Sequence, residues 1–296
     1  QLAPTEWLKS APGSLLSAIR LHIEKVESNE EGVGRFLGNF QHHFVAESLA
    51  GSLVGEGQAL AVGDFRIDDE GFTRFAIFAG PDAGQRRLGR IVQRLIEIEN
   101  YRLLSMLALP VARQINARLN DIEAEMSTLI AGIAGEGSND RETLAQLTAL
   151  SADIEAIAAE TAFRFAASRA YAALVEQRIE MLLETRAANR QTFAEFMARR
   201  FDPAMRTCAA AEKRLVDLED RAARAEGLLS ARVNVTVETQ NQALLESMNR
   251  RAELQLRLQR TVEGLSVVAI SYYAVSLAGY LVKPLGKAIG FSESTV

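Results

Sequence analysis

The feature that most constrains this chain is an uncharged run near its C-terminal end. Residues 265–282 read LSVVAISYYAVSLAGYLV and contain no Asp, Glu, Lys or Arg. A helix of this length crosses most of a hydrocarbon core of roughly 30 Å. The helical part of the chain that precedes the run is rich in Arg and Glu, so it offers little apolar surface to enclose such a helix on every side. We therefore expect a transmembrane helix, with a buried core helix as the alternative.

Helical patterning dominates the chain after a short N-terminal part. Leu, Ala, Arg, Glu and Gln recur there with helical spacing. We expect a first long helix over about 84–132, kinked where Pro110 removes a backbone donor, and a second over about 140–200. Asp202-Pro203 separates these from a third helix, because the residue before a proline avoids the α region. The third helix then continues into the uncharged run.

An apolar seam follows the third helix. It begins with heptad spacing and then drifts toward a slightly longer repeat. Such a seam favours packing against the two preceding helices, which gives an elongated helical bundle or stalk. The seam consists of Leu215, Leu218, Ala222, Ala225 and Leu229, followed by Val233, Val237, Leu244 and Met248.

The N-terminal part has the patterns of short β-strands. Residues 18–26 alternate between apolar and polar side chains, as a half-buried strand does. The segments ALAVGDFRID and FTRFAIFAG are separated by an Asp-Glu-Gly turn and are typical of a hairpin. These strands alone are too few for a well-covered domain, so we expect further strands before Gln1.

These patterns divide the chain into four expected parts. Residues 1–80 form a partial α/β cap domain, and residues 81–264 form the long-helix bundle and stalk. Residues 265–282 form the transmembrane helix, and residues 283–296 form a loop that leads to a second span. The expected fold class is therefore mainly α, with a small α/β N-terminal part and a helical bundle that continues into a C-terminal transmembrane helix.

One side of the expected spanning helix carries small and hydroxyl-bearing side chains. At 100° per residue, Ser266, Ala269, Tyr273, Ser276 and Tyr280 share that side. Hydroxyl groups in lipid need hydrogen-bond partners, so this side should face other helices or water. It is therefore either the interface of a symmetric homo-oligomer or the lining of a pore. The absence of an ionisable residue from the run disfavours a proton relay or a charged selectivity ring.

Composition and motifs exclude several functional classes. The net charge of -5 argues against a nucleic-acid partner, and a chain with one cysteine, Cys208, forms no internal disulfide. His42 and His43 are adjacent and so point in different directions, which argues against a shared metal site. Glu97 and Glu99 do not share a helical face, and no partner acid or base is identifiable. We expect no enzyme activity, no cofactor and no metal site, since the common catalytic motifs do not occur.

A weaker candidate is an anion site at the start of the first long helix. The turn at 80–84 ends on Gly84 and is followed by Arg86 and Arg87, so backbone N–H groups and guanidinium groups could hold a phosphate. The alternative is that Asp82 caps the N-terminus of this helix and no anion binds.

Several phrases resemble those of a bacterial family. They are VGDFRIDDEG, RFAIFAGP, GRIVQRLIEIENYRLLSMLALPVAR and LLESMNRRAELQLRLQRTVEGLSVVAISYYAVSLAGYL. They are similar to predicted membrane proteins grouped as domain of unknown function thirty-four twenty-two (DUF3422), and the resemblance covers essentially the whole chain. It implies an additional N-terminal portion, a second C-terminal membrane helix and a place in the bacterial inner membrane. More arginines precede the uncharged run than lysines follow it, which predicts a cytoplasmic helical body.

The order of the elements is also similar to that of CorA-type magnesium transporters. That resemblance implies a homo-oligomeric funnel whose first span lines a cation path and ends in a Gly-Met-Asn motif. Here the comparable place reads Gly279-Tyr280-Leu281, so no metal-binding residue is carried over. The expected function is a membrane-anchored homo-oligomer of CorA-like architecture that passes ions. The alternative is a non-conducting membrane scaffold or tether whose helical body binds partner proteins.

Overall fold

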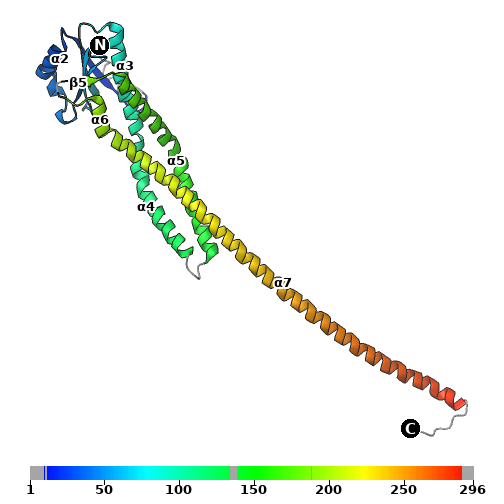
Figure 1. Ribbon diagram of the computed structural model, residues 1–296. Helices are drawn as coiled ribbons and strands as arrows, with labels where there is room; N and C mark the ends of the chain where they lie inside the picture. Colours follow the sequence, from blue (N-terminus) through cyan, green and yellow to red (C-terminus); the bar gives the residue numbers. More distant parts are fainter. Residues whose placement is uncertain (1–9, 11, 134–138, 188, 289–296) are drawn as a thin grey trace. The chain divides into compact units, whose positions relative to one another are not determined.

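The computed structural model describes residues 10, 12–133, 139–187 and 189–288, and Figure 1 shows their course. The chain divides into two compact units, Gln1–Gly227 and Leu228–Val296. Most of the described residues are helical, with a small mixed sheet in the N-terminal part and a long apolar helix at the C-terminal end. These features confirm the predicted mainly α class.

Within the described part of the first unit, the sheet has five strands in the order β1-β4-β3-β2-β5. β1 runs parallel to β4, and the other neighbours are antiparallel. The predicted strand near residue 20 and the predicted hairpin are confirmed as β1 and as β3 with β4. The other two strands, β2 and β5, were not predicted. The five strands are β1 Ile19–Lys25, β2 Ala50–Val54, β3 Ala59–Ile67, β4 Thr73–Ala79 and β5 Thr185–Arg186.

Successive side chains of each strand point to opposite faces of the sheet, and both faces are covered by other elements. On one face Phe75 and Ile77 of β4 pack in a core with the first long helix, which contributes Ile91, Leu95 and Ile98. On the other face Phe78 packs with Phe36, Leu60 and Val62. That second face is covered by α2 (Asn29–Arg35), the π-helical turn η1 (Phe36–Phe40) and the short turn η2 (Gln41–His43).

A bulge in β3 is held by buried polar groups. The register of β3 against β4 shifts between Gly63 and Ile67, and Phe65 within the bulge has φ of 54°, a conformation that large side chains rarely adopt. Arg102 Nη2 donates to the Phe65 carbonyl at 3.3 Å. Arg102 also pairs with the fully buried carboxylate of Glu99, for which sequence reasoning had identified no partner.

The first predicted helix is present as two, α3 (Gln85–Met106) and α4 (Ala108–Ile133). The break lies at Leu107, three residues before Pro110. Pro110 has no N–H to donate to the carbonyl of Met106, and its ring crowds that carbonyl. The predicted kink at Pro110 is therefore confirmed, and its position follows from the missing donor.

The prediction of one helix over 140–200 is wrong. The helix α5 (Asp140–Met181) is followed by β5 and then by α6 (Phe193–Arg200). Leu183 has φ of 48°, which ends the helix. Thr192 accepts a hydrogen bond from the Glu195 N–H while the Glu195 side chain accepts one from the Thr192 N–H, so the two form a capping box for α6.

The helix α7 (Asp202–Ala288) begins at the predicted Asp-Pro boundary and is continuous over 87 residues. In the first unit it packs with α4 and α5, and the predicted seam residues Leu215, Leu218, Ala222 and Ala225 are buried there. Residues 283–288 are helical where a loop was predicted. The rest of that predicted loop, 289–296, lies outside the described residues.

Candidate functional site

The C-terminal part of α7 carries the predicted membrane segment. Among the described residues, α7 is the one helix that is long and apolar enough to cross a membrane, and its most apolar window is not buried at all within the chain. Large side chains such as Leu265, Val268 and Leu277 are exposed. The structure therefore shows a helix that could cross a membrane, and the choice between a transmembrane helix and a buried core helix stays a prediction.

The predicted stripe lies along one side of this helix. Ser266, Ala269, Tyr273, Ser276 and Tyr280 are separated by alternating steps of three and four residues, which places them above one another on a regular α-helix. Their side chains are exposed, except that Ser276 is half-buried. The structure brings the five residues to one exposed side. The choice between a pore lining and an interface stays a prediction.

The same spacing continues toward the N-terminus, which sequence reasoning did not notice. Alternating steps of four and three residues connect twelve positions from Asn241 to Tyr280, and none of the twelve residues is charged. We call these twelve positions the uncharged face. Besides the stripe, the uncharged face contains Asn241, Leu245, Met248, Ala252, Gln255, Gln259 and Val262, all of which are exposed.

Charged side chains lie on the opposite side of this part of α7. At 100° per residue, Glu246, Arg250, Glu253, Arg257 and Arg260 form an arc centred far from the uncharged face. Arg251 and Glu263 lie outside this arc, at the edges of the uncharged face. The helix is therefore amphipathic before the membrane segment, and its charge-free side runs without interruption into that segment.

The predicted anion site lies at the N-terminus of α3. Gly84 is the N-cap residue and no side chain caps the helix, so the alternative in which Asp82 is the N-cap is wrong. Asp82 instead accepts a hydrogen bond from the Gly84 N–H through its carbonyl oxygen, at 3.0 Å. Arg86 and Arg87 are exposed. Anion binding at this turn stays a prediction.

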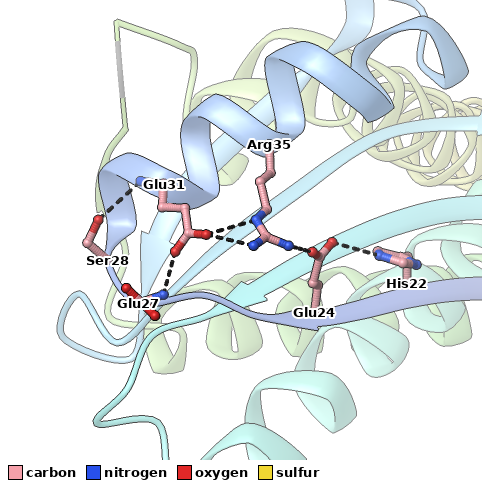
Figure 2. A network of polar contacts seen from close by, with 6 residues as sticks. All are labelled: His22, Glu24, Glu27, Ser28, Glu31 and Arg35. Carbon is pink, nitrogen blue, oxygen red and sulfur yellow. Dashed lines mark hydrogen bonds and ion pairs between the residues drawn. The ribbon is translucent and has the colours of Figure 1, made fainter.

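A network of polar contacts joins α2 to the edge strand β1, as Figure 2 shows. Arg35 donates to Glu31 Oε1 from Nη2 at 2.7 Å and from Nε at 3.0 Å, and it also pairs with Glu24 on β1. Glu24 lies 3.4 Å from His22 Nε2. Ser28 caps α2 by accepting a hydrogen bond from the Glu31 N–H at 3.1 Å. The network therefore fixes the first turn of α2 and the position of His22.

Both carboxylates of this network are held in the ionised form. Hydrogen bonds from Arg35, and then from His22, lower the pKa of Glu24 below its usual range. The pKa of Glu31 is lowered first by the backbone N–H of Glu27 and then by Arg35. The pKa of Arg35 is raised in turn by its bonds to Glu31 and Glu24. These shifts identify Arg35 as the centre of the network.

The two adjacent histidines lie close to each other, with ring centroids 4.0 Å apart. Partial burial lowers the pKa of His43, and the positive charges of His42 and Arg74 lower it further. No group of three or more His, Cys, Asp or Glu side chains within the described ranges is placed to hold a metal ion.

The fold and the exposed helix define a class of protein, namely a mostly helical chain with a small mixed sheet and one long apolar helix that could cross a membrane. The chain belongs to the family described as "Protein of unknown function (DUF3422)", whose profile matches residues 1–296. The predicted family is thereby confirmed. Comparisons with curated proteins and with solved structures give no match, so the CorA-type resemblance has no support from known proteins.

Proposed function

We propose that this protein is a membrane-anchored homo-oligomer whose copies associate through the uncharged face of α7. The observation that carries the proposal is the row of twelve charge-free positions that continues from Asn241 into the membrane segment. When two such faces meet, their hydroxyl and amide groups gain hydrogen-bond partners. The contact also buries the apolar side chains of Leu245, Met248 and Val262.

The membrane favours a parallel arrangement of the copies. Helices inserted into one bilayer with the same orientation run parallel, and a symmetric contact then pairs each residue with its counterpart in the neighbouring copy. A strict seven-residue repeat suits such a left-handed parallel contact. The charged arc stays in water on the outside. We place the helical body in the cytoplasm and the span in the bacterial inner membrane.

The oligomer serves as a scaffold or tether if its axis is sealed, with the helical body available to partner proteins. The hydroxyl groups of Ser266, Tyr273, Ser276 and Tyr280 favour a second candidate function, which is passage of ions along a hydroxyl-lined axis in an assembly like that of CorA-type transporters. The two functions differ in one observable quantity, the cation flux through the assembled protein.

Cysteine cross-linking in native membranes tests the association. In a Cys208→Ser background, Ala269→Cys lies on the uncharged face, and Ala274→Cys lies off it at nearly the same depth. Ala252→Cys and Ala243→Cys form the matched pair outside the span. We expect dimers to form by oxidation at 269 and 252, and monomers to remain at 274 and 243. Equal cross-linking at all four positions would refute the proposed interface.

Ion flux separates the two candidate functions. The full-length protein is placed in liposomes, and cation release is measured for the unmodified protein and for Tyr280→Ala. A flux that Tyr280→Ala alters supports conduction. If the unmodified protein releases no cation and the substitution changes only the cross-linking yield, conduction is excluded and the scaffold function remains.

A further inference from the structure

A cavity of about 410 Å³ lies between the strands β1 and β4 and the segment that contains η1 and η2. Its volume falls within the range of small-molecule sites, which is roughly 300–1,000 Å³. Two strands contribute charged and polar side chains, and the η segment contributes aromatic ones. The side chains that matter for binding are Arg20 and His22 on β1, Arg74 on β4, and Phe40, His43 and Phe44.

The two arginines of the cavity are direct neighbours. The parallel register of β1 and β4 pairs Arg20 with Arg74. Two like charges in this arrangement repel each other. Each arginine has one carboxylate partner, Glu70 at 2.7 Å from Arg20 and Asp68 at 2.6 Å from Arg74. An adjacent pair of cations on one strand face is an arrangement that a bound anion would stabilise.

Among the residues that the structure describes, those that line the cavity carry cationic and neutral groups but no carboxylate. Glu70 and Asp68, the partners of the arginines, lie outside it. Arg20 Nε is buried and makes no hydrogen bond within the described residues. The Arg20 guanidinium lies over the ring of Phe72, with Cζ 4.5 Å from the ring centroid, so the anion would meet its terminal Nη groups and not Nε.

Aromatic rings form another part of the cavity wall. The ring of Phe40 lies 4.3 Å from that of His22 and 5.7 Å from that of Phe78. Phe44 packs against Phe36 with ring centroids 5.8 Å apart. Such rings offer flat apolar surface to a planar group. The network of Figure 2 supports this wall, because Glu24 holds His22 and Arg35 fixes the helix that leads into η1.

A second cavity, of about 430 Å³, differs in the charges of the side chains that line it. It lies between α5 and the start of α7, and its lining mixes Arg169 and Arg206 with Glu176, Asp202 and Glu212. Arg169 and Glu212 already form an ion pair. The arginines of both cavities are ion-paired, but in this second cavity the carboxylates are part of the lining itself and would repel an anion.

We infer that the cavity between β1, β4 and the η segment binds a small organic anion with a planar apolar body. Arg20 and Arg74 hold its carboxylate or phosphate group, and the rings of Phe40, Phe44 and His22 contact its body. His43 supplies a ring nitrogen at the rim. This inference is independent of the proposed self-association, because every residue of the site lies in the first unit.

Calorimetry with a defined probe tests the site. Phenyl phosphate is titrated into the purified full-length protein, alongside inorganic phosphate and neutral phenol. We expect phenyl phosphate to bind and each of the other two to bind at least about tenfold more weakly, since each lacks one half of the recognised chemistry. Failure of phenyl phosphate to bind at millimolar concentration, or equal binding of inorganic phosphate, would overturn the inference.

Variants locate the bound probe. Arg74→Met and Arg20→Met should each weaken phenyl phosphate binding about tenfold or more, because each removes a charged donor. Arg86→Met tests the other predicted anion site, at the N-terminus of α3. Arg200→Met, at an exposed arginine of α6 outside both sites, is the control and should bind like the unmodified protein. Loss of binding in the Arg86→Met variant, with binding retained in Arg74→Met and Arg20→Met, would place the anion at α3 and overturn the inference.

A measurement on the unmodified protein keeps the test independent of how the variants fold. In protein with isotope-labelled histidine, the side-chain signals of His22 and His43 should shift together as phenyl phosphate is added. Unchanged signals for both histidines at saturating probe would show that the ligand does not enter this cavity.

Discussion

The buried ion pair of Glu99 and Arg102 is predicted to stabilise the packing of α3 against the sheet. Glu99 has no exposed surface and accepts three hydrogen bonds, from Thr73 Oγ1 at 2.7 Å and from Arg102 Nε and Nη2 at 2.7 and 2.8 Å. Arg102 also donates to the carbonyl of Phe65 in the β3 bulge. Replacing Glu99 with Gln removes the charge and leaves a nearly buried guanidinium without its counter-ion.

The expected loss follows from the burial of both partners. Removing one member of a buried ion pair costs about 3–5 kcal/mol, and the 13% exposure of the Arg102 side chain favours the lower end of that range. A loss of about 3 kcal/mol corresponds to an unfolding equilibrium constant raised roughly 150-fold. The double variant Glu99→Leu, Arg102→Leu should lose less than Glu99→Gln, because no unpaired charge remains.

Hydrogen–deuterium exchange of β3 and β4 measures this loss locally. Peptides that cover these strands should exchange about 100-fold faster in Glu99→Gln than in the unmodified protein if exchange requires opening of the sheet. Peptides from residues 241–262 of α7, which belong to the second unit, should be unchanged. A loss below about 1 kcal/mol, or a double variant as unstable as Glu99→Gln, would refute the reasoning.

Two further predictions concern the sheet and the helix that covers it. A Cβ at Gly63 would lie 2.4 Å from the ring of Phe75, so Gly63→Ala should cost about 1–3 kcal/mol in urea unfolding, whereas Gly38→Ala, which has open space, should be nearly neutral. The lowered pKa of Glu24 stabilises the fold above the ordinary carboxyl pKa of about 4.3, and this contribution disappears as the pH falls through the lowered value. Thermal unfolding between pH 6 and pH 3 should therefore lose less stability in Arg35→Met than in the unmodified protein, and parallel curves would contradict this assignment.

The sequence predicted those elements that local patterns specify. The alternation of apolar and polar residues predicted β1, and the turn sequence between two apolar segments predicted the hairpin of β3 and β4. The missing N–H of Pro110 predicted the break between α3 and α4. The segment between α5 and α6 was misread because its composition suits a helix, whereas pairing of two residues with the edge of β2 decides its structure. The Thr192–Glu195 capping box was the available signal for the start of α6.

Of the two candidate sites, one depends on a local sequence pattern and was predicted, and the other depends on strand pairing and was not. The stripe from Ser266 to Tyr280 was predicted because it depends only on helical periodicity, and its continuation to Asn241 was readable from the same rule. The cavity was not predictable, because Arg20 and Arg74 are far apart in sequence. They become neighbours only through the parallel pairing of β1 with β4, which strand order determines.

The amphipathic part of α7 before the predicted span supports the proposed association of copies in addition to the proposed anchoring. A single helix that only joined a cytoplasmic body to a membrane would be more soluble with charges on every side. Here none of the seven charged residues between Asn241 and Leu265 occupies a position of the uncharged face. The large apolar side chains of that face in this part, Leu245, Met248 and Val262, are exposed.

Confinement to a membrane reduces the entropic cost of an association that buries such a face. Copies confined to one bilayer have already lost much of their translational and orientational freedom, so a modest contact suffices to hold them together. Full burial of one Leu, Val or Met side chain contributes about 1.5–3 kcal/mol, and the face presents Leu245, Met248 and Val262. In the proposed oligomer, the uncharged amides of Gln255 and Gln259 pair across the contact and set its register, which a purely apolar face would leave undefined.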